Sequence, residues 1–365
     1  MTTTLYENSV DPVTTDGRDI NAALAELTGE AAGQKSGGKP DPHLENIAQT
    51  WEQIPQVDRN DPTYYDRPML KEPVWSWAIP AYYYVGGLTG ASLALGAATQ
   101  IGNTGERETL IRRCHLVGFV GATVSAGLLI YDLGRPMRFL YMLRVFRPTS
   151  PMNVGAWILS ITGATATGAV LFRRGRGWVA KIGTFLGYVS GVAGLALATY
   201  TGVLVAGSAV PLWQESRKAL PVLFGASAVA SAGCFFDLFV ENAEERRITN
   251  AFGTVGRMAE ISASLAMEKQ ASAVERVGLP LKRGWSGFLW KAATVCTAAS
   301  LVATFKPHQT KTTRITAGVL GTLGSLVMRF TVQHAGVLSA RDARASFYQQ
   351  RAGRGAAEVT GSQKF

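Results

Sequence analysis

The sequence predicts an all-α integral membrane protein, a bundle of about eight transmembrane helices with a disordered polar N-terminal tail. Only 17% of the 365 residues are charged, whereas soluble globular proteins carry roughly a quarter. The hydrophobic residues, 47% of the chain, gather in stretches of about 20 residues, the length that crosses a hydrocarbon core. The chain also has 40 glycines, and small residues let membrane helices pack closely. Because irregular backbone cannot face lipid, these stretches are expected to be helices.

The N-terminal segment, residues 1–62, is polar and shows no apolar period. We expect it to be disordered, or to be an arm that folds on a partner subunit. The membrane domain is expected to span 63–338, and a polar, basic tail is expected over 339–365. Tyrosines and tryptophans gather at the entry to the first span, as is typical of headgroup level.

Eight apolar stretches follow one another in the membrane domain. Their approximate limits are 78–101, 112–131, 153–172, 181–207, 219–240, 250–267, 286–305 and 313–334. The sixth is the weakest span, because it contains Arg257 and Glu260, and an amphipathic interface helix is the alternative. The first includes a run of small residues, 86–92, at which another helix is expected to approach closely.

The charge pattern favours a multi-pass protein of the cell membrane. The net charge is +10, and the basic residues fall at the ends of apolar stretches, which fits lipid headgroups better than nucleic acid. Eight spans place both termini on one side. Lysine and arginine are divided too evenly between the two sides to predict which side that is.

One connecting segment, from Tyr131 to Trp157, differs from an ordinary loop. It mixes arginine, proline and aromatic residues, and Gly134 and Pro136 interrupt regular helix. This composition suits a segment that lies flat at the membrane interface, either as an anchor or as part of a binding site.

The cysteines and histidines predict no iron–sulfur cluster and no haem in this chain. The three cysteines stand alone in or near apolar stretches, and no two have cluster spacing. Of the four histidines, only His115 and His334 lie near spans, which does not supply the facing pairs of a membrane cytochrome b.

Several motifs of the membrane domain resemble those of a known family. They are Pro-Val-Trp-Ser-Trp at 73–77 leading into Tyr-Tyr-Tyr-Val-Gly-Gly-Leu at 82–88, Asp-Leu-Gly-Arg-Pro at 132–136, Arg-Pro-Thr-Ser-Pro-Met at 147–152, Tyr-Thr-Gly-Val-Leu at 200–204 and Pro-Leu-Trp at 211–213. On these motifs the chain resembles the polysulfide reductase membrane-subunit family, also called NrfD-like or PsrC-like, over roughly 64–345. The long N-terminal tail departs from the shorter members.

The resemblance implies a quinone-interacting membrane subunit of a multi-subunit oxidoreductase. Such a subunit exchanges electrons between a ferredoxin-like iron–sulfur partner and the membrane quinone pool, menaquinone or ubiquinone, and anchors the complex. The catalytic centre is then expected on another chain, a molybdopterin-type subunit. The resemblance also implies a quinone site near the start of the first span and the end of the second, here Tyr82 to Gly87 and Tyr131 to Arg135.

Within those segments we predict specific roles. A quinone site needs apolar rings, hydrogen bonds to two carbonyl oxygens and a source of protons. Tyr83, Tyr84 and Tyr131 are candidates to bind the headgroup, although each one taken singly is more typical of an interfacial anchor. Asp132 is the candidate proton donor or relay, with Arg135 orienting it; a purely structural ion pair is the alternative.

Ionisable residues inside the spans form a second group of candidates. They are costly in a membrane and mark a pathway or a pair. The candidates for a proton path are His115, Asp237, Arg257, Glu260 and Arg329, with His334 also in the last span. Arg257 and Glu260 stand three residues apart and are expected to pair, and His115 is expected to be a satisfied interfacial histidine. A proton-translocating or transporter-like module and a purely structural anchor are the alternative functions.

Overall fold

The structure is a computed structural model that describes residues 20–21, 26–27, 70–102, 105–240, 242–306 and 310–351. The prediction of a disordered tail over 1–62 falls almost wholly outside these residues. Two short strands are described within that segment: β1 (Ile20–Asn21) pairs antiparallel with β2 (Glu26–Leu27).

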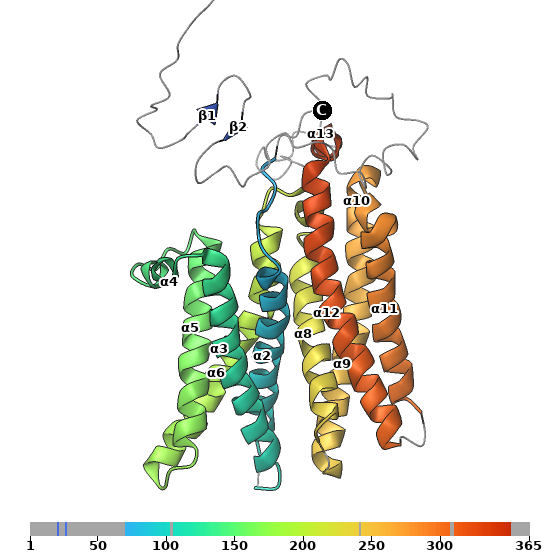
Figure 1. The fold of residues 1–365 in the computed structure, drawn as a ribbon. Coiled ribbons are helices and arrows are strands. Elements are labelled where there is room, and N and C mark those ends of the chain that lie inside the picture. Colours follow the sequence, from blue (N-terminus) through green and yellow to red (C-terminus); the bar gives the residue numbers. More distant parts are fainter. Residues whose placement is uncertain are drawn as a thin grey trace, which may run out of the picture.

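Eight long helices form the bundle in the described part of the chain (Figure 1). They are α2 (Ala78–Gln100), α3 (Glu108–Leu133), α5 (Pro151–Phe172), α6 (Trp178–Ala206), α8 (Ala219–Asp237), α9 (Ala243–Ala271), α11 (Gly284–Thr304) and α12 (Lys311–Arg341). Each coincides with one predicted stretch. The helices generally run a few residues further than the apolar pattern, because polar residues complete their terminal turns.

Four short helices lie in the connections or after the bundle. They are α4 (Pro136–Met142), α7 (Pro211–Glu215), α10 (Glu275–Lys282) and α13 (Ala343–Arg351). Helix therefore continues through α13 beyond the predicted start of the polar tail at 339. Residues 352–365 of that tail lie outside the described residues.

The bundle consists of two groups of four helices (Figure 1). In the first group, α2 and α5 each pack against both α3 and α6. In the second group, α8 and α11 each pack against both α9 and α12. Contacts of α8 with α6 and α2, and of α12 with α2, join the two groups. Helices α2, α8 and α12 therefore form the centre of the molecule.

Close backbone contacts at glycine hold the helices together. A Cβ added at Gly90 of α2 would lie 2.2 Å from the carbonyl oxygen of Gly194 in α6, and one added at Gly233 of α8 would lie 2.2 Å from Cα of Gly253 in α9. The close approach predicted for the run 86–92 is thus confirmed at Gly90.

The two ends of the bundle carry different connections. The upper end carries residues 70–77, α4, α7 and α10, and the lower end carries the connections near 101–107, 173–177, 238–242 and 305–310 (Figure 1). The start of α2 and the end of α3 therefore meet at the upper end, which is the arrangement that a site shared by the two requires.

Six of the helices are long and apolar enough to cross a membrane: α3, α5, α6, α8, α11 and α12. Large apolar side chains cover their outer surfaces, for example Val192, which is 71% exposed, and Val295, which is 65% exposed. The chain is a helical membrane protein. Helix α2 does not reach the same hydropathy because of its tyrosines and glycines, and α9 carries charged residues.

Candidate functional site

The carboxylate of Asp132 is held at the upper end by residues that precede α2. Its Oδ1 accepts a hydrogen bond from the backbone N–H of Ser76 at 2.9 Å and another from the Ser76 hydroxyl at 2.6 Å. These two bonds join the last turn of α3 to the entry of α2. The Asp132–Arg135 ion pair stays a prediction, and Ser76 is a partner that sequence reasoning did not identify.

Tyr131 lies at the surface beside this contact. Its side chain is 63% exposed, and its ring packs against Trp77 with the ring centroids 5.9 Å apart. An exposed aromatic pair at the end of two spans is typical of headgroup level. Tyr131 and Asp132 are therefore brought to one place, with Tyr131 facing outward.

Tyr83 and Tyr84 point in different directions, because consecutive helical residues are about 100° apart. Tyr83 is 1% exposed, and its ring packs edge-on against Phe224 of α8 at 5.6 Å. Tyr84 is half-buried. Neither hydroxyl forms a geometrically good hydrogen bond with a described residue, and the Tyr84 hydroxyl lies near Thr322.

A further buried hydroxyl without a hydrogen-bond partner among the described residues lies on the facing helix. Ser125 of α3 is fully buried and has no hydrogen-bond partner among the described residues. It lies against Gly86, where an added Cβ would be 3.7 Å from Ser125 Oγ. Ser125 precedes Asp132 by seven residues, so the two share a face of α3, and Tyr83 lies in the second turn of α2. The buried hydroxyls therefore lie two turns below the Ser76–Asp132 contact.

Arg329 of α12 reaches the centre of the bundle with no exposed surface. Its guanidinium donates to the carbonyl oxygens of Tyr83 and Phe224 and lies 4.8 Å over the Phe224 ring. The arginine can be buried here because the two carbonyl oxygens accept hydrogen bonds from its guanidinium. It thereby connects α2, α8 and α12 directly below the tyrosines.

The second group of helices holds two more buried charged side chains. Glu260 of α9, 2% exposed, accepts hydrogen bonds from the Ser325 hydroxyl at 3.0 and 3.2 Å. Arg257, fully buried one turn away, donates to Cys234 Sγ at 3.0 Å and to Ser300 Oγ at 3.2 Å. No direct bond joins Arg257 and Glu260 among these described residues, and each side chain has hydroxyl or thiol partners on a neighbouring helix; their pairing stays a prediction.

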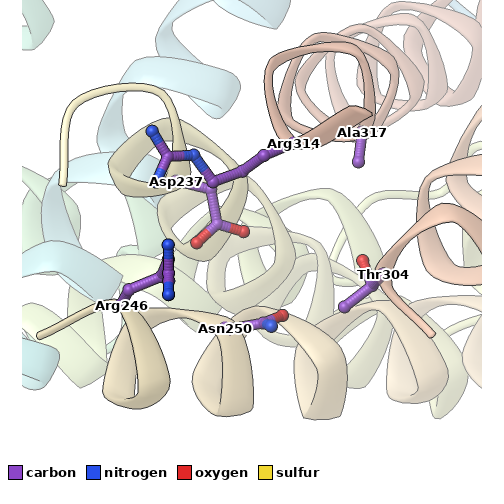
Figure 2. Close-up of a pocket in the computed structure, with 6 residues that line it drawn as sticks. All are labelled: Asp237, Arg246, Asn250, Thr304, Arg314 and Ala317. Atoms are coloured by element: carbon purple, nitrogen blue, oxygen red, sulfur yellow. The ribbon is translucent and has the colours of Figure 1, made fainter. Parts of the chain in front are cut away.

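Asp237 lies at the lower end of α8, at a small hollow. Figure 2 shows its carboxylate directed into the hollow near Arg246 and Arg314, with Asn250, Thr304 and Ala317 completing the wall. Asp237 is 5% exposed and accepts a hydrogen bond from Thr249 at 3.1 Å. A carboxylate with arginines beside it is therefore placed at the opposite end from Asp132.

His115 is buried at the lower end of the first group. It is 1% exposed, and neither ring nitrogen has a hydrogen-bond partner among the described residues. The expectation of a satisfied histidine was thus wrong within this part of the chain. The neighbouring Gln100 Oε1 accepts from Arg173, whose guanidinium also binds Glu108 through two bonds of 2.7 and 2.8 Å. His115 is far from the tyrosines along α3, as predicted from its position.

The described residues contain no group of three histidine, cysteine or acidic side chains that could hold a metal ion. By their positions along the helices, the predicted candidates divide into three places: Tyr83, Tyr84, Tyr131, Asp132 and Arg135 toward the upper end, Glu260, Arg257 and Arg329 in the middle, and Asp237 and His115 at the lower end. Sequence reasoning missed Ser76 and Ser125, since a serine beside an apolar stretch carries no distinctive pattern.

Residues 64–267 match the sequence profile of the polysulfide reductase family, NrfD_2. This match covers more than half of the chain. The chain belongs to the NrfD polysulfide reductase family. The family resemblance predicted from the motifs is confirmed. The matched range contains the candidate residues of the upper end, and it also contains Glu260 in the middle and Asp237 at the lower end.

Among curated proteins none matches the NrfD-family chain. Among solved structures it is similar to bd oxidase from Geobacillus thermodenitrificans, with a TM-score of 0.48 and 11% sequence identity over 70% of this chain and 83% of that chain. A likeness at this level carries no information about activity.

Proposed function

We propose that this chain is the quinone-interacting membrane subunit of a multi-subunit oxidoreductase. In this role it exchanges electrons between a ferredoxin-like iron–sulfur subunit and menaquinone or ubiquinone in the membrane, and it anchors a molybdopterin-type catalytic subunit. Membership of the NrfD family supports this proposal. The observation that carries it is that the buried hydroxyls of Tyr83 and Ser125, on the two helices joined by the Ser76–Asp132 contact, have no hydrogen-bond partner in the described part of the chain.

The upper-end residues fit a quinone headgroup chemically. A quinone supplies a two-electron, two-proton redox couple, whose two carbonyl oxygens need hydrogen-bond donors. The Tyr83 hydroxyl and the Ser125 hydroxyl are such donors, in an apolar setting formed by aromatic rings. Asp132, fixed by Ser76, holds or releases a proton at its carboxylate within the last turn of α3.

The full chain is proposed to cross the membrane eight times. Helices α2 and α9 are the two additional spans. Helix α2 has 23 residues, which corresponds to roughly 34 Å, and it packs against α3, α6, α8 and α12. Its tyrosines and glycines face neighbouring helices rather than lipid, so it does not need the hydropathy of a peripheral span.

Quinone binding by the purified assembly tests this function. We expect Tyr83→Phe to weaken binding of a menaquinone or ubiquinone analogue by roughly fivefold, since a hydrogen bond contributes about 1 kcal/mol. Asp132→Asn is expected to lower quinone-coupled turnover while the complex stays assembled. Tyr188→Phe, which removes a hydroxyl from a partly exposed tyrosine of α6, is the matched control. Normal binding and turnover in both site variants would place the site elsewhere.

A second candidate function is proton uptake from the lower end. The observation that favours it is a succession of buried polar groups in the second group of helices. It begins at Asp237 and Thr249, continues through Arg257 with Cys234 and Ser300, and reaches Glu260 with Ser325. Arg329 and the Tyr84 hydroxyl lie beyond it toward the upper end. Charged side chains at this depth are costly and commonly mark a proton route.

Proton uptake is measured separately from quinone turnover. In proteoliposomes we expect Asp237→Asn and Glu260→Gln to lower proton uptake per quinone reduced, while quinone affinity is unchanged. Glu275→Gln, an exposed acid on α10, is the control. If both variants retain the wild-type ratio of protons to electrons, these residues have only a structural role.

A further inference from the structure

Helix α4 (Pro136–Met142) lies beside the bundle rather than on top of it. In Figure 1 it projects sideways from the upper ends of α3 and α5, away from the central helices α2, α8 and α12. In a membrane-embedded bundle, this is the level of the lipid headgroups. A position outside the helix cluster at that depth is surrounded by lipid rather than by other spans.

The exposed side of α4 is apolar. Phe139 is 8% exposed and is the residue of α4 that is buried. Met137, Leu140 and Tyr141 are 54%, 52% and 58% exposed. They stand at i, i+3 and i+4 and form one stripe, which a helical period of 3.6 places on a side different from that of Phe139. The stripe therefore faces away from the contact that Phe139 makes.

The charged side chains of this segment have a single sign. Arg138, Arg144 and Arg147 are exposed and form no ion pair with any described residue. No aspartate or glutamate occurs from residue 133 to residue 152. Exposed arginines without nearby carboxylates favour an anionic partner, and the guanidinium group matches the geometry of phosphate.

The turn after α4 is fixed in place. The Asn153 side chain donates to the carbonyl oxygens of Met142 and Val145 and accepts from the backbone N–H of Arg147. Phe146 packs edge-on against Trp157 of α5, with ring centroids 6.2 Å apart. The arginines are therefore carried by a defined segment and not by a freely moving loop.

We propose that residues 136–147 form an interfacial surface that binds the phosphate headgroups of anionic phospholipids. The stripe of Met137, Leu140 and Tyr141 enters the boundary between headgroups and acyl chains, and the arginines bind phosphate above it. A docked protein subunit fits this surface less well, because α4 lies beside the bundle, at a level where the bilayer surrounds it (Figure 1). The proposal is independent of the quinone function.

Lipid retention by the full-length protein tests the proposal. The protein is reconstituted into nanodiscs of phosphatidylcholine with or without phosphatidylglycerol, and bound lipid is counted by native mass spectrometry after release. Hydrogen exchange is followed for the peptides that cover 136–147. We expect phosphatidylglycerol to be retained preferentially and to slow exchange in this segment.

The double variant Arg138→Gln/Arg144→Gln is compared with Arg174→Gln/Arg176→Gln. The control pair is also exposed, lies at the lower end and removes the same charge. Each basic side chain near an anionic surface contributes a factor of about five, so the α4 variant is expected to lose phosphatidylglycerol at least several-fold more than the control. Equal loss in both variants, or exchange that slows only when a soluble partner subunit is added, would overturn the proposal.

Discussion

At the residue scale, Arg329 shows how this bundle accommodates a buried charge. Its guanidinium donates to the carbonyl oxygens of Tyr83 and Phe224, which belong to helices on two sides of α12. Gly87 makes this position possible: a Cβ added there would lie 2.7 Å from one Arg329 terminal nitrogen and 3.0 Å from the guanidinium carbon. The guanidinium fills the space that a side chain at residue 87 would need.

Gly87→Ala is therefore expected to destabilise the protein. The new methyl group displaces the Arg329 guanidinium, which is enclosed and cannot reach solvent, and its bonds to α2 and α8 lengthen. We expect a loss of about 2 kcal/mol, seen as a melting temperature lower by several degrees in detergent. Gly127→Ala on α3 is the control, because nothing lies within 4 Å of an added Cβ there. Equal melting temperatures for the two variants would contradict the contact.

Individual partners at this scale were only partly predictable. The pattern of ionisable residues within apolar stretches identified Asp237, Arg257, Glu260 and Arg329, and all four are buried. Their partners were not predictable, since they are set by which helices become neighbours: Glu260 accepts a hydrogen bond from Ser325 on α12. Similarly, Ser76 contacts Asp132 across 56 residues of sequence.

At the element scale, the connection between α3 and α5 depends on one side chain. Asn153 closes the turn through bonds to the main chain of Met142, Val145 and Arg147. Ser150 caps α5 by accepting from the Asn153 N–H. The sequence predicted an interfacial segment here from its arginines and aromatic residues, but the short helix α4 and its clamp were not predicted.

Asn153→Asp is expected to loosen this connection. The carboxylate keeps the size of the amide but has no N–H to donate to Met142 and Val145, so two buried bonds of about 1 kcal/mol each are lost. Hydrogen exchange over 138–150 is expected to rise, while exchange in the middle of α5 stays unchanged. Asn250→Asp, at the lower end, is the control. A uniform rise along the whole chain would indicate general destabilisation instead of a local clamp.

Element boundaries followed from hydropathy because lipid imposes the length of a span. All eight predicted stretches coincide with a long helix of the described chain. The most polar stretch, 250–267, became the 29-residue helix α9, in which Arg257 and Glu260 are buried against α8 and α12 instead of facing outward. Tertiary contacts, which a single stretch of sequence does not reveal, decide how such a helix is used.

At the scale of the whole molecule, the lower ends of α3 and α9 join the two groups of helices. The Arg107 guanidinium binds the Glu244 carboxylate at 2.7 Å, and the buried Glu245 accepts from the Leu110 N–H at 2.9 Å. Both carboxylates belong to the first turn of α9, and their partners belong to the start of α3. At the centre of the molecule, contacts of α2 with α8 and α12 also join the two groups of helices.

The Arg107–Glu244 bond predicts a pH dependence of stability. The hydrogen bond from Arg107 holds the pKa of the Glu244 carboxyl below its ordinary value. Its contribution is therefore fully present above the unfolded-state pKa of about 4.3 and is lost as the pH falls through the lower, folded-state pKa. The contribution is small, because Glu244 is exposed and salt screens the pair.

Thermal unfolding in detergent checks this expectation. At low ionic strength and pH 7, Glu244→Gln is expected to melt slightly below the wild type, and the difference is expected to close as the pH is lowered past the folded-state pKa. Adding salt at pH 7 is expected to reduce the same difference, since the pair is solvent-accessible. Glu275→Gln on α10 is expected to show neither trend. If the difference in melting temperature between Glu244→Gln and the wild type persists at acidic pH, Glu244 stabilises the protein through packing and not through its charge. The contact between α3 and α9 would then depend on Glu245 and the apolar residues around it.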